Sequence, residues 1–434
     1  MSRRLRSLAL ALRLVVAALL TALCVGGLVR LYSPTLGPGG GAERQLAFIR
    51  QQLEAGAGDD AQGLFPEGYF FLHELYALAW VDVGRHRGDR AEALRNARWA
   101  LSRLDGPQGT APFTESLSPR YGIFYAGWTN WLRGGILSLQ PAGERDPGEV
   151  ERFERDSRAI AAAFDGSRTP FLTAYPGQSW PVDSTVAVAS LRLHDVLLPA
   201  AFGPTVQRWV AAARERLDPA TGLLPHVSDP ETGAPAQGAR GSSQSVIQRF
   251  LVDVDPGFAR EQYLGFRAQF VVRPLWLGPA VREYPQGTDG PGDVDSGPLP
   301  LGVSLSATVV TLGAARVQGD DALAGALSSY GELAGVPVDT LRTKRYALGQ
   351  LPIGDAFLVW ARTAEPWVAG GVAPPAATIG PLWKLPLTFL LLFGGDWPLL
   401  VAWLAIRRQA QRREQAGDGP GEGGVVDPVV PERL

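Results

Sequence analysis

The chain has 434 residues, of which 46% are apolar, and a formal net charge of −2 at pH 7. This length can bury one large core or two smaller ones, and the near-neutral charge argues against a nucleic-acid partner. Cys24 is the only cysteine and the four histidines are scattered, so we exclude an internal disulfide and cysteine-ligated metal, and we expect no bound metal and no cofactor.

Each end of the chain carries an apolar segment long enough to cross a bilayer. The first lies within residues 1–31, with its apolar part at 12–29, and the second spans residues 385–406. Arginines lie beyond the outer end of each segment, at Arg3, Arg4, Arg6, Arg407, Arg408, Arg412 and Arg413. The positive-inside rule therefore predicts cytoplasmic termini and an extracytoplasmic main domain, at the inner membrane of a bacterium.

These segments leave two questions open. The basic start and apolar middle of the first also fit a cleaved signal peptide, although we favour an uncleaved anchor. Asp396 lies midway along the second segment, where a charge costs about 2.5–3.5 kcal/mol on insertion scales. It is protonated, faces another helix or marks a shorter span.

The segments between and beyond the anchors divide by composition. Residues 32–64 are rich in glycine and polar residues and are predicted to form a linker with an entry helix. Residues 371–384 are predicted to be a second linker. Residues 407–434 are predicted to be a cytoplasmic tail that is disordered, because its end, GDGPGEGGVVDPVVPERL, is rich in glycine and proline and has no means of packing a core.

Residues 65–370 repeat one theme, in which an apolar helical run, a Gly/Pro/Asp turn and a more charged helical run follow one another. The first helix of each pair is the more apolar, as expected for an inner and an outer layer of helices. The predicted pairs are 70–84 with 88–104, 124–139 with 151–164, 185–197 with 205–217, 242–254 with 259–271, and 304–317 with 321–334, followed by a helix at 355–365. The predicted fold class is all-α, an (α/α)6 toroid, with an open helical solenoid as the alternative.

Polar and aromatic residues gather where the apolar helices begin. These stretches are 65–76, 121–132, 175–184, 238–245 and 281–298. If the helices form an inner ring, the stretches would line one mouth, which is therefore the expected position of a binding pocket.

The chain resembles the linalool dehydratase/isomerase family of (α/α)6 barrels, over roughly residues 65–365. The resemblance rests on five stretches in the family's order: YAGWTNWL, DSTVAVASL, LDPATGLLPHVSDPETG, VDPGF followed by a helix and VREYPQGTD, and AARVQGD. It implies a barrel fold and turnover of a terpene alcohol with cysteines and a histidine. It places Asp183 or Val182 at a family cysteine and Trp128 at the family histidine. The barrel segment contains no cysteine, so we expect carboxylates to carry any chemistry.

Asp183 is the first candidate catalytic residue. It lies between Trp180 and an apolar helix, where the loss of water can raise the pKa of a carboxyl group until it serves as a general acid. The alternative is a helix N-cap, a role that the neighbouring Ser184 could also fill.

Asp293 and Asp295 form a second candidate catalytic pair. Two carboxyl groups separated by one residue can act as acid and base if their surroundings move their pKa values apart. A calcium-like site and a plain turn are the alternatives. For Glu283 we expect an ion pair with Arg282 that braces the loop.

Aromatic and polar residues of the same stretches, with Tyr346 just before the last helix, are candidates for substrate binding. They are Trp128, Trp180, Tyr125, Tyr175, Glu283, Arg240 and Tyr346. The aromatic rings would hold an apolar or cyclic substrate. His226, in a loop between hairpins, is expected to be solvated.

These features predict a membrane-anchored lyase, dehydratase or isomerase that acts by general acid–base catalysis on a lipid-like or isoprenoid alcohol. One alternative is a hydrolase or epimerase of cell-envelope glycan, because helical toroids also host sugar chemistry. Another is a non-catalytic scaffold for an envelope assembly. The expected partners are the membrane and a small lipidic or glycan substrate, and a homo-oligomer is left open.

Overall fold

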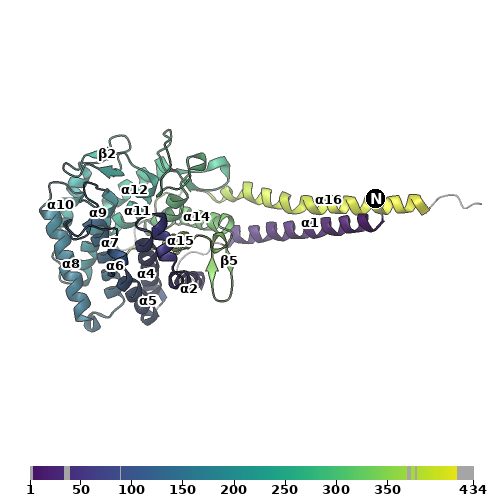
Figure 1. Cartoon of the computed structure of the whole chain (residues 1–434). Helices are drawn as coiled ribbons and strands as arrows, with labels where there is room; N and C mark the ends of the chain where they lie inside the picture. Colours follow the sequence, from purple (N-terminus) through teal and green to yellow (C-terminus); the bar gives the residue numbers. More distant parts are fainter. Residues whose placement is uncertain (1–2, 34–39, 88, 369–372, 377–378, 418–434) are drawn as a thin grey trace, which may run out of the picture. The chain divides into compact units, whose positions relative to one another are not determined.

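The computed structural model describes residues 3–33, 40–87, 89–368, 373–376 and 379–417 (Figure 1). The chain divides into two compact units. The first combines residues 1–29 with 385–434, and the second is formed by residues 30–384. Each unit is described by itself below.

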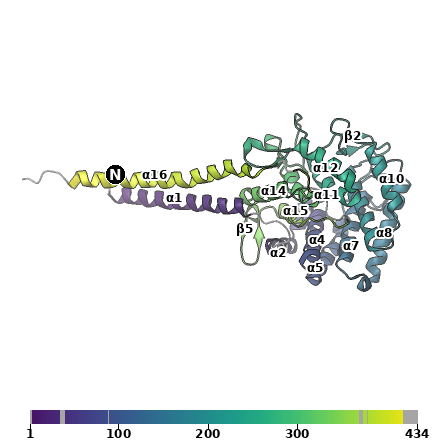
Figure 2. The same ribbon diagram turned by 180° about the vertical axis from the view of Figure 1, so that it is seen from behind.

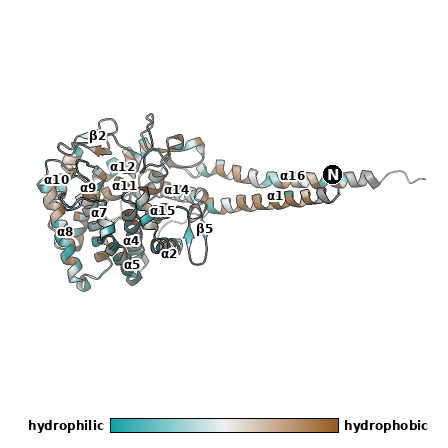
Figure 3. Cartoon of the chain, in the orientation of Figure 1, coloured by the Kyte–Doolittle hydropathy of each residue, from teal (hydrophilic) through white to brown (hydrophobic). Residues whose placement is uncertain are grey.

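The first unit consists of two long helices, α1 (Arg3–Tyr32) and α16 (Leu385–Gly417). The stretches Leu8–Tyr32 and Pro381–Arg408 are long and apolar enough to cross a membrane by length and composition. Figure 3 shows brown, apolar residues along both helices. Most side chains in these stretches are exposed, unlike those of a core helix in a soluble protein.

Small residues bring the two helices of this unit together. The Thr21 hydroxyl donates a hydrogen bond of 3.0 Å to the carbonyl oxygen of Gly395, and Cys24 packs against Gly394 and Gly395. Asp396 is exposed on α16. The helix continues to Gly417, so residues 407–417 of the predicted tail are helical, while residues 418–434 lie outside the described part of the chain.

Six apolar helices provide most of the core of the second unit. They are α4 (Gly68–Arg87), α7 (Gly122–Ser138), α9 (Pro181–Leu197), α11 (Gly241–Val254), α13 (Leu305–Val317) and α15 (Pro352–Thr363). We call them the core helices. Each contacts the next in this order, and α15 contacts α4, so the series of neighbours returns to its start. On α7, fifteen of the seventeen residues are buried, as expected for a helix that is apolar on all sides.

A second set of helices packs outside the first. They are α2 (Gly40–Glu54), α5 (Arg90–Leu104), α8 (Pro147–Asp165), α10 (Gly203–Arg214), α12 (Pro256–Phe270) and α14 (Asp321–Ala334). Each of the last five contacts the core helix before it in the sequence, and α2 contacts α4 and α15. In both Figure 1 and Figure 2, α8 and α10 lie at the periphery of this unit. Because α2 contacts α4 and α15, the predicted entry helix is part of the helical layers.

The connections contain short helices and three two-stranded antiparallel sheets. The short helices are α3 (Ala57–Leu64), α6 (Pro107–Thr110), η1 (Ala142–Glu144), η2 (Pro274–Trp276), η3 (Pro300–Gly302), η4 (Ala347–Gly349) and η5 (Pro381–Lys384). The strand pairs are β1 (Val227–Ser228) with β2 (Pro235–Gln237), β3 (Val271–Val272) with β4 (Ala280–Val281), and β5 (Val338–Asp339) with β6 (Lys344–Arg345). The prediction of a mostly helical chain is confirmed.

The two layers of helices begin differently. The outer helices α5, α8, α12 and α14 each start at an aspartate whose carboxylate accepts a first-turn N–H, at Asp89, Asp146, Asp255 and Asp320. The core helices α7, α9, α11 and α15 begin without a side-chain cap. At α11 the N–H of Ser242 donates instead to the carboxylate of Glu283, and the N–H of Gly241 donates to the Glu283 carbonyl oxygen.

Trp367 closes the packing near the C-terminal half of α7. Its ring stacks on Trp131, with 4.5 Å between ring centroids and 6° between ring planes. A Cβ atom at Gly135 would lie 2.6 Å from the Trp367 ring, so only glycine fits there.

We therefore expect Gly135→Ala to lower the free energy of unfolding by about 1–3 kcal/mol through overpacking. Gly331→Ala is the matched control, because a Cβ there meets no atom within 4 Å. The control should raise the free energy of unfolding by roughly 0.5–1 kcal/mol. Chemical unfolding in detergent measures both, and equal effects would contradict this account of Gly135.

Candidate functional site

Asp183 lies in the first turn of α9 and is only 5% exposed. The N-cap residue of this helix is Trp180, and the helix has no side-chain cap. Ser184 does not cap the helix either, because its hydroxyl accepts the Leu172 N–H at 3.0 Å. The capping alternative for Asp183 is therefore wrong, and its carboxyl group is buried in the first turn of α9.

Two further carboxyl groups are close enough to Asp183 to act on its charge. Glu67 precedes α4, Asp295 lies in the loop before α13, and each raises the pKa of Asp183 by repulsion. The Tyr175 hydroxyl donates a hydrogen bond to Glu67, and burial, followed by the charge of Glu67, raises the pKa of this phenol. We call Glu67, Asp183 and Asp295 the carboxyl cluster.

Two members of the carboxyl cluster have raised pKa values. Burial, followed by the charges of Glu67 and Asp295, raises the pKa of Asp183 well above its usual value. Residue Asp295 is exposed as a whole, yet the protein around its carboxyl group raises the pKa to about 6, first by loss of water and then through Asp293 and Glu67. Asp183 is therefore the candidate acid of the cluster and Asp295 the candidate base.

Aromatic side chains pack on one side of Asp183. The Trp128 indole N–H has no hydrogen-bond partner, but it is near enough to the carboxyl group to oppose the rise in the pKa of Asp183. The ring of Trp128 contacts Phe71, Phe124, Phe250 and Trp360, with centroid distances of 5.1–6.3 Å. This packing keeps water from one side of the acid.

Two predicted substrate-binding residues, Tyr175 and Trp180, lie together in the segment just before α9. Both are partly buried, and their rings meet edge to face at 5.8 Å. The segment that carries them is fixed by hydrogen bonds between Ala174 and Gln178 and between Ser228 and Ser179. Their ring surfaces are available for a ligand.

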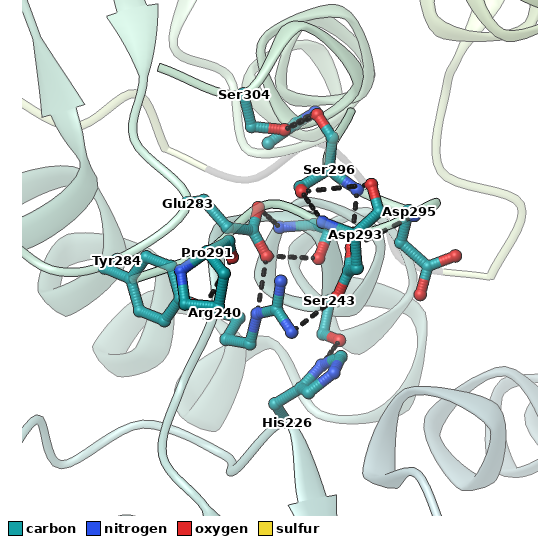
Figure 4. Close-up of polar contacts among 12 residues, drawn as sticks. His226, Arg240, Ser243, Glu283, Tyr284, Pro291, Asp293, Asp295, Ser296 and Ser304 are labelled. Carbon is teal, nitrogen blue, oxygen red and sulfur yellow. Dashed lines mark hydrogen bonds and ion pairs between the residues drawn. The ribbon is translucent and has the colours of Figure 1, made fainter. Parts of the chain in front are cut away.

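Asp293 lies in an ion-pair network that supports the loop of Asp295 (Figure 4). The guanidinium of Arg240 contacts Asp293 at 2.6 Å and the fully buried Glu283 at 2.8 Å. Although burial acts to raise it, hydrogen bonds from Ser296 and Arg240 hold the pKa of Asp293 below its usual value. One oxygen of Asp293 also accepts the N–H of Asp295 at 3.1 Å. Figure 4 shows the Asp295 carboxylate pointing away from Arg240.

Two expectations for this region are wrong. Glu283 pairs with Arg240 and accepts hydrogen bonds from Ser242, whereas Arg282 pairs with Asp289. His226 is 5% exposed rather than solvated, and its Nδ1 lies 2.5 Å from the Ser243 hydroxyl. Burial and the charge of Arg240 lower the pKa of His226 to about 4, so the ring is neutral at pH 7.

Two predicted substrate-binding residues have their partners elsewhere. The Tyr125 hydroxyl donates to the carbonyl oxygen of Leu104 and to Asp105, between α7 and the end of α5. Tyr346 bonds Glu332 and Arg362, between α14 and α15. Within the described residues, neither tyrosine shares a hydrogen-bond partner with the carboxyl cluster.

Glu67 is the site residue that the sequence reasoning missed. It lies in the stretch 65–76, which was recognised as one of the polar and aromatic stretches, and it directly precedes the apolar helix α4. Asp183 is likewise a carboxyl group at the start of an apolar helix, so the same sequence pattern indicates Glu67.

Two clefts of the second unit lie apart from the carboxyl cluster. A cleft of about 400 Å³ is lined by residues of α5, α7 and α8, and one of about 360 Å³ by residues of α2 to α5. Neither includes a member of the carboxyl cluster. Among the described residues, no three His, Cys, Asp or Glu side chains are grouped to hold a metal ion.

No protein-family model matches the chain, and no curated protein matches it.

We expect Asp183→Asn to stabilise the fold at neutral and alkaline pH. Because the pKa of Asp183 is raised in the folded state, its stabilising contribution is present below pH 3.8 and is lost as pH rises through the folded value. Asparagine does not titrate, so the free energy of unfolding of the variant at pH 8 should exceed that of the wild type by on the order of 1–3 kcal/mol. Chemical unfolding should show that this difference disappears near pH 4. Exposed Asp60→Asn is the control, and parallel pH curves for Asp183→Asn and wild type would contradict the burial argument.

Arg240→Met should destabilise the protein by about 3–5 kcal/mol, because it leaves the charge of Glu283 buried without its partner. Arg282→Met removes an ion pair with the exposed Asp289 on the same loop and should cost about 1 kcal/mol or less. Unfolding by guanidinium in detergent compares the two. Equal losses in the free energy of unfolding would show that the ion pairs of Arg240 do not stabilise the loop.

Proposed function

We propose that the second unit is an (α/α)6 toroid held outside the cytoplasm of a bacterium by α1 and α16. The closed series of contacts among the core helices, with an outer helix beside each, supports the toroid. Arginines outside both apolar segments support cytoplasmic termini. The resemblance to the linalool dehydratase/isomerase family is part of the same proposal.

We propose further that the site catalyses acid–base elimination or isomerisation of a lipid-like or isoprenoid alcohol. The observation that carries this proposal is the buried Asp183, whose pKa is raised well above its usual value, within electrostatic reach of Asp295, whose pKa is about 6. Such a pair can move protons in opposite directions without a metal or a thiol.

In this mechanism Asp183 gives its proton to the substrate hydroxyl, the C–O bond breaks and water leaves. Asp295 takes a proton from the neighbouring carbon, and the electron pair of that C–H bond forms the alkene. The faces of Trp128 and Tyr175 stabilise positive charge that develops on carbon. Proton transfer from Asp295 back to Asp183, through Glu67 or water, resets the site.

Aromatic surroundings favour an apolar substrate. The aromatic side chains of Trp128, Phe71 and Phe124 offer no hydroxyl or amide groups for a sugar. Asp293 has the role of a positioning residue, because Arg240 already holds its carboxylate.

A hydrolase or epimerase of envelope glycan is the second candidate. The observation that favours it is the partly buried Trp180 beside Tyr175, since aromatic faces also stack on sugar rings. Two carboxyl groups likewise serve glycoside hydrolysis.

Complementation of a deletion strain tests the catalytic role. Asp183→Asn and Asp295→Asn should each abolish complementation, because each removes one proton-transfer group. Asp289→Asn, on the same loop as Asp295 and 84% exposed, should complement fully. Lipid and glycan profiles of the deletion strain identify the substrate class.

An accumulated isoprenoid alcohol supports the lyase or isomerase, and an altered polysaccharide alone overturns it in favour of the glycan enzyme. Full complementation by both Asp183→Asn and Asp295→Asn, at wild-type protein levels, overturns catalysis and leaves a scaffold.

A further inference from the structure

Several loops of the second unit expose large apolar side chains. Six of these side chains have exposed fractions from 50% to 100%: Leu275, Trp276, Leu301, Val336, Leu341 and Leu348. We call these six residues the apolar rim. Single exposed leucines are ordinary on a soluble protein, but exposed apolar residues grouped on neighbouring loops mark an interaction surface.

Most of the rim residues have a backbone conformation that is energetically unfavourable. Five of the six rim residues have a positive φ, between 44° and 62°, and Leu341 is the exception. This left-handed conformation costs roughly 1–2 kcal/mol for a residue with a Cβ atom. Strained, exposed and apolar residues are unfavourable in water, so the rim requires a function other than folding.

The rim loops are neighbours around the end of α14. The turn that carries Leu275 and Trp276 packs on this helix, because Gly278 meets the ring of Tyr330. Val336 follows α14 directly, and Leu341 lies in the turn between β5 and β6. Leu348 is close, since the N–H of Ala347 donates to the Gly335 carbonyl at 2.8 Å. Leu301 is joined to the β3–β4 hairpin through Arg282.

The chain enters and leaves the second unit beside the same loops. The Arg30 guanidinium donates to the carbonyl of Pro337 at 3.1 Å, next to Val336. The Lys384 ammonium donates to the carbonyl of Leu31 at 3.0 Å and lies 4.9 Å from the centre of the Tyr32 ring. Both junctions with the candidate membrane spans therefore lie at the β5–β6 end of the rim. Tyrosine and lysine at the ends of apolar helices are typical of a bilayer interface.

We propose that the apolar rim docks into the lipid bilayer surface. A membrane is the occupant that the junctions indicate, because Arg30 and Lys384, the first and last residues of this unit, both lie beside these loops. Leucine and tryptophan on rigid turns can enter the boundary between headgroups and acyl chains, where they lose contact with water.

Docking of the rim also concerns the carboxyl cluster. Leu301 and Asp295 belong to the same loop, between β4 and α13. A substrate dissolved in the bilayer would reach the site across this loop without passing through water. This inference rests on the proposed membrane anchoring and lipidic substrate.

Spin-label accessibility of the full-length protein tests the docking. In a Cys24→Ala background, single cysteines are introduced as Leu275→Cys and Leu341→Cys, labelled with a nitroxide and reconstituted into phosphatidylcholine/phosphatidylglycerol vesicles. Val196→Cys and Leu264→Cys are controls, because these exposed apolar residues lie on helices α9 and α12, outside the rim. We expect both rim labels to collide several-fold more with oxygen, and several-fold less with a water-soluble nickel chelate, than the controls.

Rim labels that meet the nickel chelate as often as the controls would overturn the proposal. Labels hidden from both oxygen and nickel would also overturn it, because a protein surface or a second copy would then cover the rim. Adding Asp183→Asn should leave the label accessibilities unchanged. Failed docking thus shows in the spectra alone, whereas failed catalysis shows in the complementation assay alone.

Discussion

A buried carboxyl group at the start of a core helix is the constraint on which the candidate site depends. Asp183 is placed there by α9, whose N-cap residue is Trp180, and the indole of Trp128 is near enough to act on its carboxyl group. Burial removes water, and the loss of water raises the pKa of Asp183 well above its usual value. The neighbouring carboxylates strengthen this effect, so the cluster offers a candidate acid and a candidate base.

The two helical layers contribute differently to this arrangement. Aspartate caps satisfy the first-turn N–H groups of four outer helices, whereas α7, α9, α11 and α15 start without such caps. At α11 the first-turn N–H groups meet Glu283, whose carboxylate accepts the N–H of Ser242. Arg240, the N-cap residue of α11, supports the loop of Asp295, because its guanidinium joins Glu283 to Asp293.

Helices were predictable because their apolar periodicity and their Asp-Pro or Gly boundaries are local signals. The predicted hairpin 124–139 with 151–164, for example, falls within α7 and α8. Contacts that depend on the fold were not predictable in this way. The pairing of Glu283 with Arg240 joins residues 43 positions apart, while Arg282 was adjacent in sequence and was chosen for that reason. His226 is buried because β1 packs against the segment at Ser179, which the loop sequence alone does not indicate. The approach of Glu67 to Asp183 likewise depends on how α4 and α9 are arranged.

The apolar rim has a practical consequence for producing the second unit by itself. A truncated protein without α1 and α16 would keep Leu275, Trp276 and Leu341 exposed to water, on turns whose backbone prevents the first two from folding inward. Surfaces of this kind promote self-association in solution. Solubility of the truncated unit would therefore depend on detergent or on polar replacements at these positions, even though its core is complete.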